Sequence, residues 1–163
     1  MKFLTILLIA LFSSNSFANT RQFKEWKTDA GKDYSEAYNH NNSGSILGFF
    51  CSSSGCIHYF DVRTTCVDGQ ITNLLIATNK STINADATCV VINLGNKPRY
   101  VNRIDTAIVS LLQQGSSVSI AMALEGGQIK VSRFSLAGYT EAVYFASSSV
   151  YKGEVKDYRD TTY

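Results

Sequence analysis

Hydrophobic and polar residues alternate along much of the chain beyond residue 20. The clearest case is the segment 117–124, SVSIAMAL, in which every second side chain from Val118 to Leu124 is apolar. A period of two is typical of a strand with one buried face, and apolar runs between polar turns are further strand candidates. The predicted strands are residues 46–51, 56–62, 71–78, 89–94, 117–124 and 129–134.

Short polar segments separate these strands. SSSG (residues 52–55) and EGGQ (125–128) have the length and composition of β-hairpin loops. NKSTINADA (79–87) and GNKP (95–98) are predicted turns between strands. Adjacent strands joined in this way predict antiparallel pairing.

Two segments follow a helical period instead, and we predict short helices over about 105–114 and 136–146. Asp105 and Ser135 are placed to cap these helices, and Gly115 is placed to end the first. Because each segment has one apolar face, both helices are expected to pack on the sheet. The predicted fold class is therefore mainly β, an antiparallel β-sandwich-like domain with two short α-helices. The apolar stripes are Ile104, Ala107, Ile108, Leu111 and Leu112 in the first segment, and Leu136, Tyr139, Thr140, Val143 and Tyr144 in the second.

The first 18 residues have the order of a secretory signal peptide. One lysine precedes an apolar run over 3–12, which is followed by small and polar residues ending Ser16-Phe17-Ala18. This run is shorter than the 18 or so apolar residues that a membrane-spanning helix requires, and we expect no membrane span in the rest of the chain. Residues 19–163 are therefore predicted to be one exported β-rich domain, periplasmic or secreted, with a polar tail over about 152–163.

Charge offers no argument for a nucleic-acid partner. The formal net charge is +2 for the whole chain, and it falls to +1 when Lys2 is removed with the signal peptide. Basic and acidic residues are interspersed, so we expect no binding to nucleic acid or to an anionic membrane surface. The predicted partner is a protein of unidentified kind, and the sequence does not define the oligomeric state.

Four cysteines lie in the predicted exported domain. In an oxidising compartment they favour two disulfides, for which three pairings are conceivable. If SSSG closes a hairpin, Cys51 and Cys56 are directly opposite each other at the short separation that a disulfide needs. The predicted pairs are then Cys51 with Cys56 and Cys66 with Cys89.

His58 is the residue of the predicted hairpin whose side chain is the best candidate for a chemical role. The same hairpin register places it opposite Phe49, on the face that carries Leu47, Phe60 and Val62. We expect a half-buried histidine beside an aromatic ring, with a backbone carbonyl bonded to one ring nitrogen. The spacing Cys-x4-Cys-x-His lacks the ligand pairs of a zinc site, so no metal and no cofactor is predicted.

No catalytic motif is found in the sequence. The chain has no Gly-x-Ser-x-Gly elbow, no Walker loop, no Gly-x-Gly-x-x-Gly and no His-Glu-x-x-His. We therefore predict a protein that is not an enzyme and has no catalytic residues. An acid pair brought together only by folding stays open as an alternative.

Residues 105–143 resemble the closing part of the invasion-associated locus B family of exported bacterial proteins. The matching residues are Gly115, Val118 and Ile120, followed by Ser135, Leu136, Gly138, Tyr139 and Ala142. FKEWKT, with Trp26, is similar to the first strand of that family. The resemblance implies an exported β-sandwich-like domain without a cofactor, linked in some bacteria to host-cell entry. The Ser135-Leu136-x-Gly138-Tyr139 motif itself is interpreted as structural: a cap, two docking side chains and a glycine that allows close approach to the sheet.

Two functions follow from these observations. The first is a protein-binding module of the bacterial envelope, with host interaction as one role, whose contacts are residues that alternation leaves outside: Tyr59, Ile57 and Phe50. The alternative is a purely structural role, in which these side chains are covered by a second sheet or a helix. The alternative function is a periplasmic enzyme inhibitor or immunity-type protein in which the clasped loop Ser52, Ser53 and Ser54 is the inserting element.

Overall fold

A computed structural model describes residues 20–63, 65–94, 97–104 and 108–150. The predicted signal peptide and polar tail lie outside these residues. The described part contains ten strands, two α-helices and one 3₁₀ turn. The strands are β1 (Arg21–Phe23), β2 (Trp26–Ala30), β3 (Tyr34–His40), β4 (Ile46–Ser52), β5 (Gly55–Asp61), β6 (Ile71–Thr78), β7 (Thr82–Leu94), β8 (Lys97–Ile104), β9 (Ser117–Ala123) and β10 (Ile129–Ser135). The helices are α1 (Val109–Gln114) and α2 (Tyr139–Val150), and the 3₁₀ turn is η1 (Glu125–Gly127).

All described strands belong to one antiparallel sheet in the order β1-β2-β3-β4-β5-β8-β7-β6-β9-β10. The predicted mainly β class with two short helices is confirmed, as are the six predicted strands. The predicted turn over 79–87 is too long, because β7 begins at Thr82 and pairs with β6 from Ala77 back to Ile71. Residues 82–87 do alternate, but the exposed Asn84 and Asp86 are residue types typical of turns, so this part of the strand resembles a turn in the sequence.

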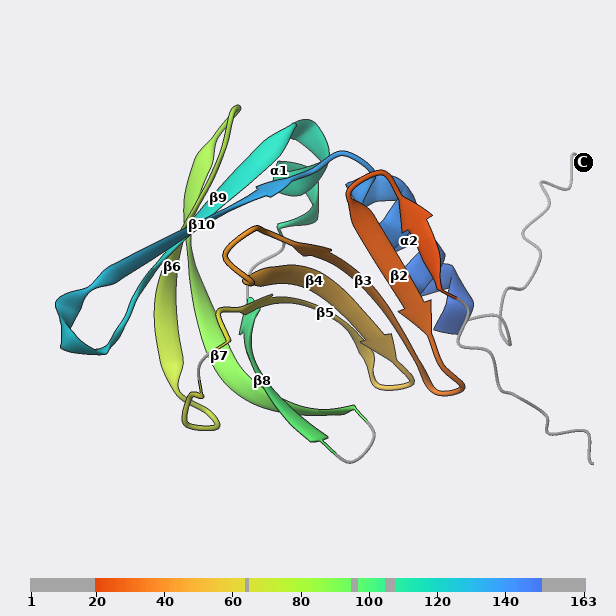
Figure 1. The fold of residues 1–163 in the computed structure, drawn as a ribbon, viewed down its shortest axis with the longest axis horizontal. Coiled ribbons are helices and arrows are strands. Elements are labelled where there is room, and N and C mark those ends of the chain that lie inside the picture. Colours follow the sequence, from red (N-terminus) through yellow and green to blue (C-terminus); the bar gives the residue numbers. More distant parts are fainter. Residues whose placement is uncertain (1–19, 64, 95–96, 105–107, 151–163) are drawn as a thin grey trace, which may run out of the picture.

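The sheet coils, so that its two ends face each other (Figure 1). Phe60 on β5 and Phe134 on β10 meet edge to face, with ring centroids 6.1 Å apart. Side chains also bridge the gap, because Asn39 Nδ2 and Trp26 Nε1 both donate to the carbonyl of Ser135, at 2.9 and 3.0 Å. A sandwich-like arrangement thus arises from a single sheet.

Both faces of the sheet bury apolar side chains. The main core lies on the inner face and includes Trp26, Leu47, Phe60, Ile76 and Ile120, all fully buried. A second, smaller core lies on the opposite face, where the long β7 and its neighbour β8 curl beneath β4 and β5 (Figure 1). Its buried members are Ile46, Tyr59 and Val101, with Tyr38, Phe50, Val90 and Ile92 packed around them.

The first predicted helix is shorter than expected. Its proposed cap, Asp105, lies outside the described residues, and α1 begins at Val109 and ends before Gly115 as predicted. Ile104 is not helical, because it is the last residue of β8 and is paired with both His58 and Ala87. Two ladders hold this residue in an extended conformation. Of the predicted stripe, Ala107 lies outside the described residues, and Ile108, Leu111 and Leu112 are buried.

The second predicted helix begins later and presents a different face. α2 starts at Tyr139, and its buried residues are Tyr139, Ala142 and Ala146. Tyr144, predicted to dock, is 74% exposed. A helix lying close over β2, β3 and β4 requires small side chains on its inner face, and the alanines therefore form that face in place of Thr140 and Tyr144.

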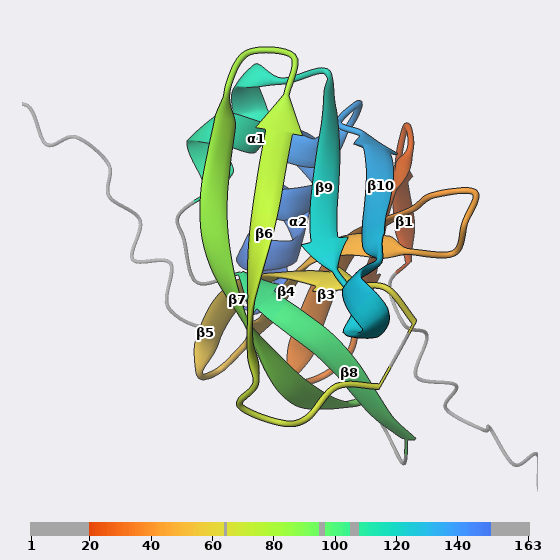
Figure 2. The same cartoon turned by 90° about the vertical axis from the view of Figure 1, so that its left-hand side faces the viewer.

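The opposite side of the molecule carries no helix among the described residues. Figure 2 shows β7, β6, β9 and β10 side by side toward the viewer, with α1 and α2 behind them. The outer face of these four strands is therefore open.

Candidate functional site

The hairpin of β4 and β5 is clasped by its own cysteines. Cys51 and Cys56 are directly opposite each other, with Cα atoms 4.1 Å apart, and they form a disulfide. The predicted pairing is confirmed, but the predicted four-residue loop is too long. Ser52 pairs with Gly55, so only residues 53–54 form the turn. Gly55 takes a φ of 123°, a conformation that tight hairpins reserve for glycine.

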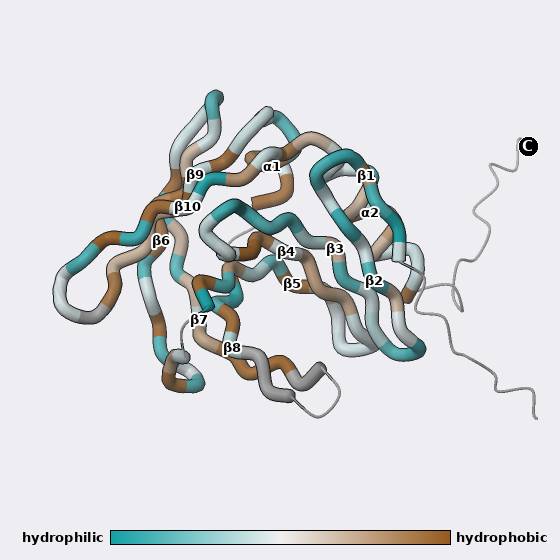
Figure 3. The backbone as a smooth tube through the Cα atoms, in the orientation of Figure 1, coloured by the Kyte–Doolittle hydropathy of each residue, from teal (hydrophilic) through white to brown (hydrophobic). Residues whose placement is uncertain are grey.

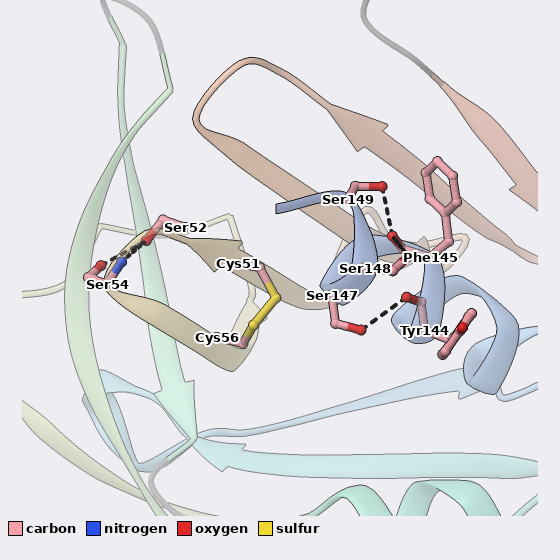
Figure 4. The surroundings of a disulfide bond; sticks show 9 residues. All are labelled: Cys51, Ser52, Ser54, Cys56, Tyr144, Phe145, Ser147, Ser148 and Ser149. Atoms are coloured by element: carbon pink, nitrogen blue, oxygen red, sulfur yellow. Dashed lines mark hydrogen bonds between the residues drawn. A yellow bond between two sulfur atoms is a disulfide. The ribbon is translucent and has the colours of Figure 1, made fainter. Parts of the chain in front are cut away.

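The tip is exposed, whereas the disulfide is largely buried. Ser53 and Ser54 are exposed, and the Ser52 and Ser54 hydroxyls are hydrogen-bonded at 2.7 Å. Cys51 is fully buried. Figure 4 shows the disulfide on the side of the hairpin that faces the C-terminal half of α2. The clasp therefore anchors the hairpin to the main core, and Ser53 and Ser54 are the exposed residues of its tip.

Tyr59, predicted as an exposed contact residue, is fully buried. Its hydroxyl donates to Oε1 of Glu36 on β3, a residue that is only 5% exposed. Alternation correctly places Tyr59 on the face opposite His58. That face is covered by β7 and β8, however, so the prediction of an interaction role for Tyr59 is wrong.

The other two residues of this predicted surface are half-buried. Phe50 stacks on Tyr34, with ring centroids 5.9 Å apart and an angle of 14° between the rings, and Ile57 is its neighbour across the hairpin. A structural role, in which these side chains are covered by the fold, therefore describes them better than a role in contact with a partner.

His58 lies on the core face of β5, opposite Phe49 as predicted. It is 8% exposed, and its Nε2 bonds to the hydroxyl of Tyr139 at 2.9 Å rather than to a backbone carbonyl. Burial lowers the pKa of His58 to about 4, and burial also raises the pKa of Tyr139. Both rings are therefore neutral at pH 7. A neutral, enclosed pair of this kind stabilises the attachment of α2 and offers no accessible general base.

The motif around Ser135 serves the junction between β10 and α2. Ser135 is the last residue of β10 and not the N-cap of α2, although its Oγ accepts a hydrogen bond from the Ala137 amide at 3.2 Å. Leu136 and Tyr139 are buried, as the docking role predicts. Gly138 has a φ of 90°, and a Cβ at this position would overlap the carbonyl oxygen of Phe23. The motif is thus explained by packing.

The second disulfide joins Cys66 to Cys89, as predicted. Beside it is an open hollow of about 480 Å³ at one end of the main core. Its lining includes Asn102, Gln70 and Thr72 but no carboxylate, histidine or lysine, so these side chains provide no acid or base. The full lining is Thr65, Cys66, Val67, Gln70, Thr72, Asn102, Met122, Ala123 and Leu124.

Folding brings one pair of carboxylates together. Asp29 on β2 and Glu36 on β3 are directly opposite each other, and both line a hollow of about 190 Å³ with His40 and Arg63. This volume is below the 300 Å³ or so at which small-molecule sites begin. Glu36 is bonded to Tyr59 inside the second core. The arrangement favours a structural role for this pair.

Within the described ranges, no group of three or more His, Cys, Asp and Glu side chains is arranged to hold a metal ion. The same residues contain no helix with the length and apolar character needed to cross a membrane.

A surface that sequence reasoning missed lies on the open side of β6, β9 and β10. Large apolar side chains are exposed there: Ile71 (68%), Leu75 (45%), Ile129 (70%) and Val131 (54%). Leu75, Ala121 and Val131 form one continuous row across the three strands, and Ala123 and Ile129 form part of the next. We call these six residues, Ile71, Leu75, Ala121, Ala123, Ile129 and Val131, the outer apolar face.

The signal for this face was present in the sequence. ITNLLIAT, over Ile71–Thr78, carries apolar residues at both odd and even positions, so that one set must face away from the core. Figure 3 shows that hydrophobic residues are dense along β6, β9 and β10, out to the hairpin that joins β9 and β10. Alternation identifies one apolar face of a strand, and it does not show that a second apolar face is exposed.

No protein-family model and no curated protein matches the chain. Among solved structures, the chain is similar to the crystal structure of invasion associated protein B from Bartonella henselae. The TM-score is 0.53 and the sequence identity 11%, and the alignment covers 79% of this chain and 96% of that one. At this identity the likeness shows the fold alone. It confirms, at the level of the fold, the resemblance that residues 105–143 indicate. The two disulfides fit a protein that folds in an oxidising compartment.

Proposed function

We propose that this chain is a non-enzymatic protein-interaction domain, exported to the bacterial envelope, and that the outer apolar face is its contact surface. One observation carries the proposal: four large apolar side chains are exposed on one face of the sheet, two on β6 and two on β10, with only alanines of β9 between them. Monomeric soluble proteins expose few large apolar patches, and the largest patch on a typical monomer is often functional.

Export is supported by two independent features. Residues 1–18 have the charge, apolar core and small-residue end of a signal peptide. The two disulfides, one of them fully buried at Cys51, are of the kind that forms and persists outside the cytoplasm. The domain would then act in the periplasm or after secretion.

A binding role is favoured over catalysis by the state of the titratable groups. His58 is enclosed and Glu36 is bonded to Tyr59. The larger hollow is lined by neutral side chains. The similar fold belongs to a protein named for its association with invasion, so host-cell surface proteins belong among the partners to be tested.

The test is site-specific photo-crosslinking from Leu75 in envelopes of the source bacterium. We expect an adduct with a protein, and we expect the adduct to be competed away by unlabelled wild type and by Val109→Asp. Val131→Asp should compete poorly, because it places a charge within the face. Val109 is a matched control, since it is 39% exposed but lies on α1, away from the face. Equal competition by both variants, or no protein adduct, would contradict the proposal.

An enzyme inhibitor or immunity-type role remains the second candidate, because the Ser53–Ser54 turn is exposed and held by a disulfide. Preorganised loops bind with a smaller loss of entropy. A Ser53→Arg variant should then lose its partner in a pull-down from envelope extract. Unchanged recovery of the partner would exclude this loop as the contact.

A further inference from the structure

The strands β7, β6, β9 and β10 lie side by side (Figure 2), and their register arranges the outward-facing residues in a grid. Strand pairing defines two rows that cross all four strands, and a third in which Asn73 lies beside Ala123 when the register of β6 and β9 is extended by one residue. Given strand spacing of about 4.8 Å and a rise of about 3.3 Å per residue, the grid is about 14 Å wide and about 13 Å tall. It is therefore almost square. The rows are Asp86, Asn73, Ala123 and Ile129; then Asn84, Leu75, Ala121 and Val131; then Thr82, Ala77, Ser119 and Arg133.

The two charged residues of this grid stand at opposite corners. Asp86 is at the β7 corner of the first row, and Arg133 is at the β10 corner of the third. Both are exposed, and Asp86 Oδ1 accepts a hydrogen bond from Asn73 at 3.2 Å. Arg103 lies on β8, outside the grid. A square face with opposite charges on one diagonal is complementary to itself.

We propose that the outer apolar face binds a second copy of this chain, through a two-fold axis along the other diagonal, from Thr82 to Ile129. This names the partner of the surface described under the proposed function, and it rests on that function. Rotation about this axis brings Asp86 of each copy opposite Arg133 of the other, so that two equivalent ion pairs close the interface. The strands of the two sheets then cross at nearly 90°, one of the two angles at which sheets pack face to face.

The centre of the grid is shaped for this contact. Leu75 is the only large side chain in the middle of the grid, and its neighbours Ala77, Ala121 and Ala123 are small. Near the two-fold axis, the Leu75 side chain of each copy lies over the shallow positions of the other copy. Apolar burial at the centre and charge pairing at the corners together give one orientation.

The size of the face predicts a weak dimer. A grid of this width and height covers about 200 Å², and its exposed rim adds to this, whereas stable interfaces bury about 800 Å² on each partner. We therefore expect a monomer at low micromolar concentration and a rising dimer fraction at hundreds of micromolar.

Analytical ultracentrifugation of four proteins tests the proposal: wild type, Asp86→Arg, Arg133→Asp and the double variant. Each single reversal places like charges opposite each other and should lower the dimer association constant at least tenfold. The double variant restores opposite charges and should recover most of the wild-type association. Both positions are exposed, so the fold is expected to tolerate all four proteins, and circular dichroism verifies this.

Two outcomes would overturn the dimer. One is a wild type that is monomeric up to about 1 mM, a concentration at which even weak complexes form. The other is a double variant no better associated than the single reversals. If crosslinking from Leu75 still captures a different protein in either case, the interaction domain stands and only its partner is reassigned. If no protein adduct forms at all, the proposed function fails as well.

Discussion

His58 on β5 and Tyr139 at the start of α2 are joined by a buried hydrogen bond between Nε2 and the phenol oxygen, 2.9 Å long. The two residues are 81 positions apart in the sequence. The Tyr139 ring also meets Trp26 of β2 edge to face, with ring centroids 5.1 Å apart. One tyrosine thus connects α2 to two strands of the sheet, through a neutral histidine on β5 and an indole on β2.

Stability should fall as the solution is acidified through the range of His58. Burial lowers the pKa of His58 from 6.5 in the unfolded chain to about 4 in the fold. Between these values the unfolded chain binds the proton more strongly, so protonation favours unfolding. The free energy of unfolding should be highest above pH 6.5 and should decrease by up to about 3 kcal/mol at pH 4, at 1.36 kcal/mol for each pKa unit. Urea titrations from pH 4 to 7 measure the decrease.

The matched variant for this prediction is His58→Gln, which keeps a hydrogen-bonding side chain without a titration in this range. We expect lower stability at pH 7 and a flatter dependence between pH 4 and 6.5. An unchanged pH profile in this variant would assign the acid sensitivity to other groups.

Tyr139→Phe should lower the free energy of unfolding by about 1–3 kcal/mol, because it leaves the buried Nε2 of His58 without its partner.

Gly48 on β4 and Tyr59 on β5 are directly opposite each other, and the Tyr59 ring fits only because residue 48 has no side chain. The Tyr59 ring lies over Gly48 and is fixed at its far end by the bond to Glu36, so a Cβ at position 48 has no space. Gly48→Ala should destabilise the fold by about 2–3 kcal/mol, in the range for overpacked cores. Chemical denaturation gives the value. In the control Gly31→Ala the Cβ meets the ring of Tyr34, which is only half-buried and can move, and the cost should be below about 1 kcal/mol.

The coupling between these two residues can be measured directly. In a Tyr59→Leu background, Gly48→Ala should cost less than in the wild type, because the overlapping ring is gone. Additive effects of the two substitutions would show that the ring does not determine the cost at position 48.

Local patterns in the sequence were sufficient for six of the ten described strands, for the two predicted hairpins and for the disulfides. They did not identify β1, β3 or β8. The register of the clasped hairpin depends on where its turn is centred, which is the same for a four-residue and a two-residue loop, and it correctly places Cys51 opposite Cys56 and His58 opposite Phe49. The same alternation could not tell which faces are covered. Tyr59 alternates outward and is nevertheless fully buried, since β7 and β8 curl beneath it, and this coiling depends on contacts between distant parts of the chain.

The candidate surface was missed for a related reason. Leu75 and Val131 become neighbours only when β6, β9 and β10 are placed side by side, and the strand order of a sheet is not encoded in any one segment. The buried face of α2 was also mispredicted, because a helical stripe read from hydrophobicity favours Tyr144 over the small alanines that close packing requires.

The two disulfides should differ in their contribution to stability. Cys51–Cys56 spans 5 positions, whereas Cys66–Cys89 spans 23. In the loop-entropy model these closures contribute about 2 and about 3.5 kcal/mol. Replacing the second pair with alanines should therefore destabilise the protein more than replacing the first.

Denaturation of the two double variants measures the difference, after mass spectrometry with alkylation has verified two disulfides in the wild type. A larger loss for the shorter loop would mean that packing of the fully buried Cys51 outweighs loop entropy.

Gly138 should be among the least replaceable residues of the chain. Two effects add at this position: φ is 90°, and a Cβ would overlap the backbone carbonyl of Phe23, which cannot move without shifting β1. Gly138→Ala should therefore lower the free energy of unfolding by about 3 kcal/mol or more, through backbone strain and steric overlap together.

Gly126→Ala separates the two effects, because Gly126 has a similar φ of 82° but nothing within 4 Å of the added carbon. That variant should lose only about 1 kcal/mol, the cost of the left-handed conformation alone. If thermal or chemical denaturation gives equal losses for the two variants, contact between α2 and β1 is not what requires glycine at position 138.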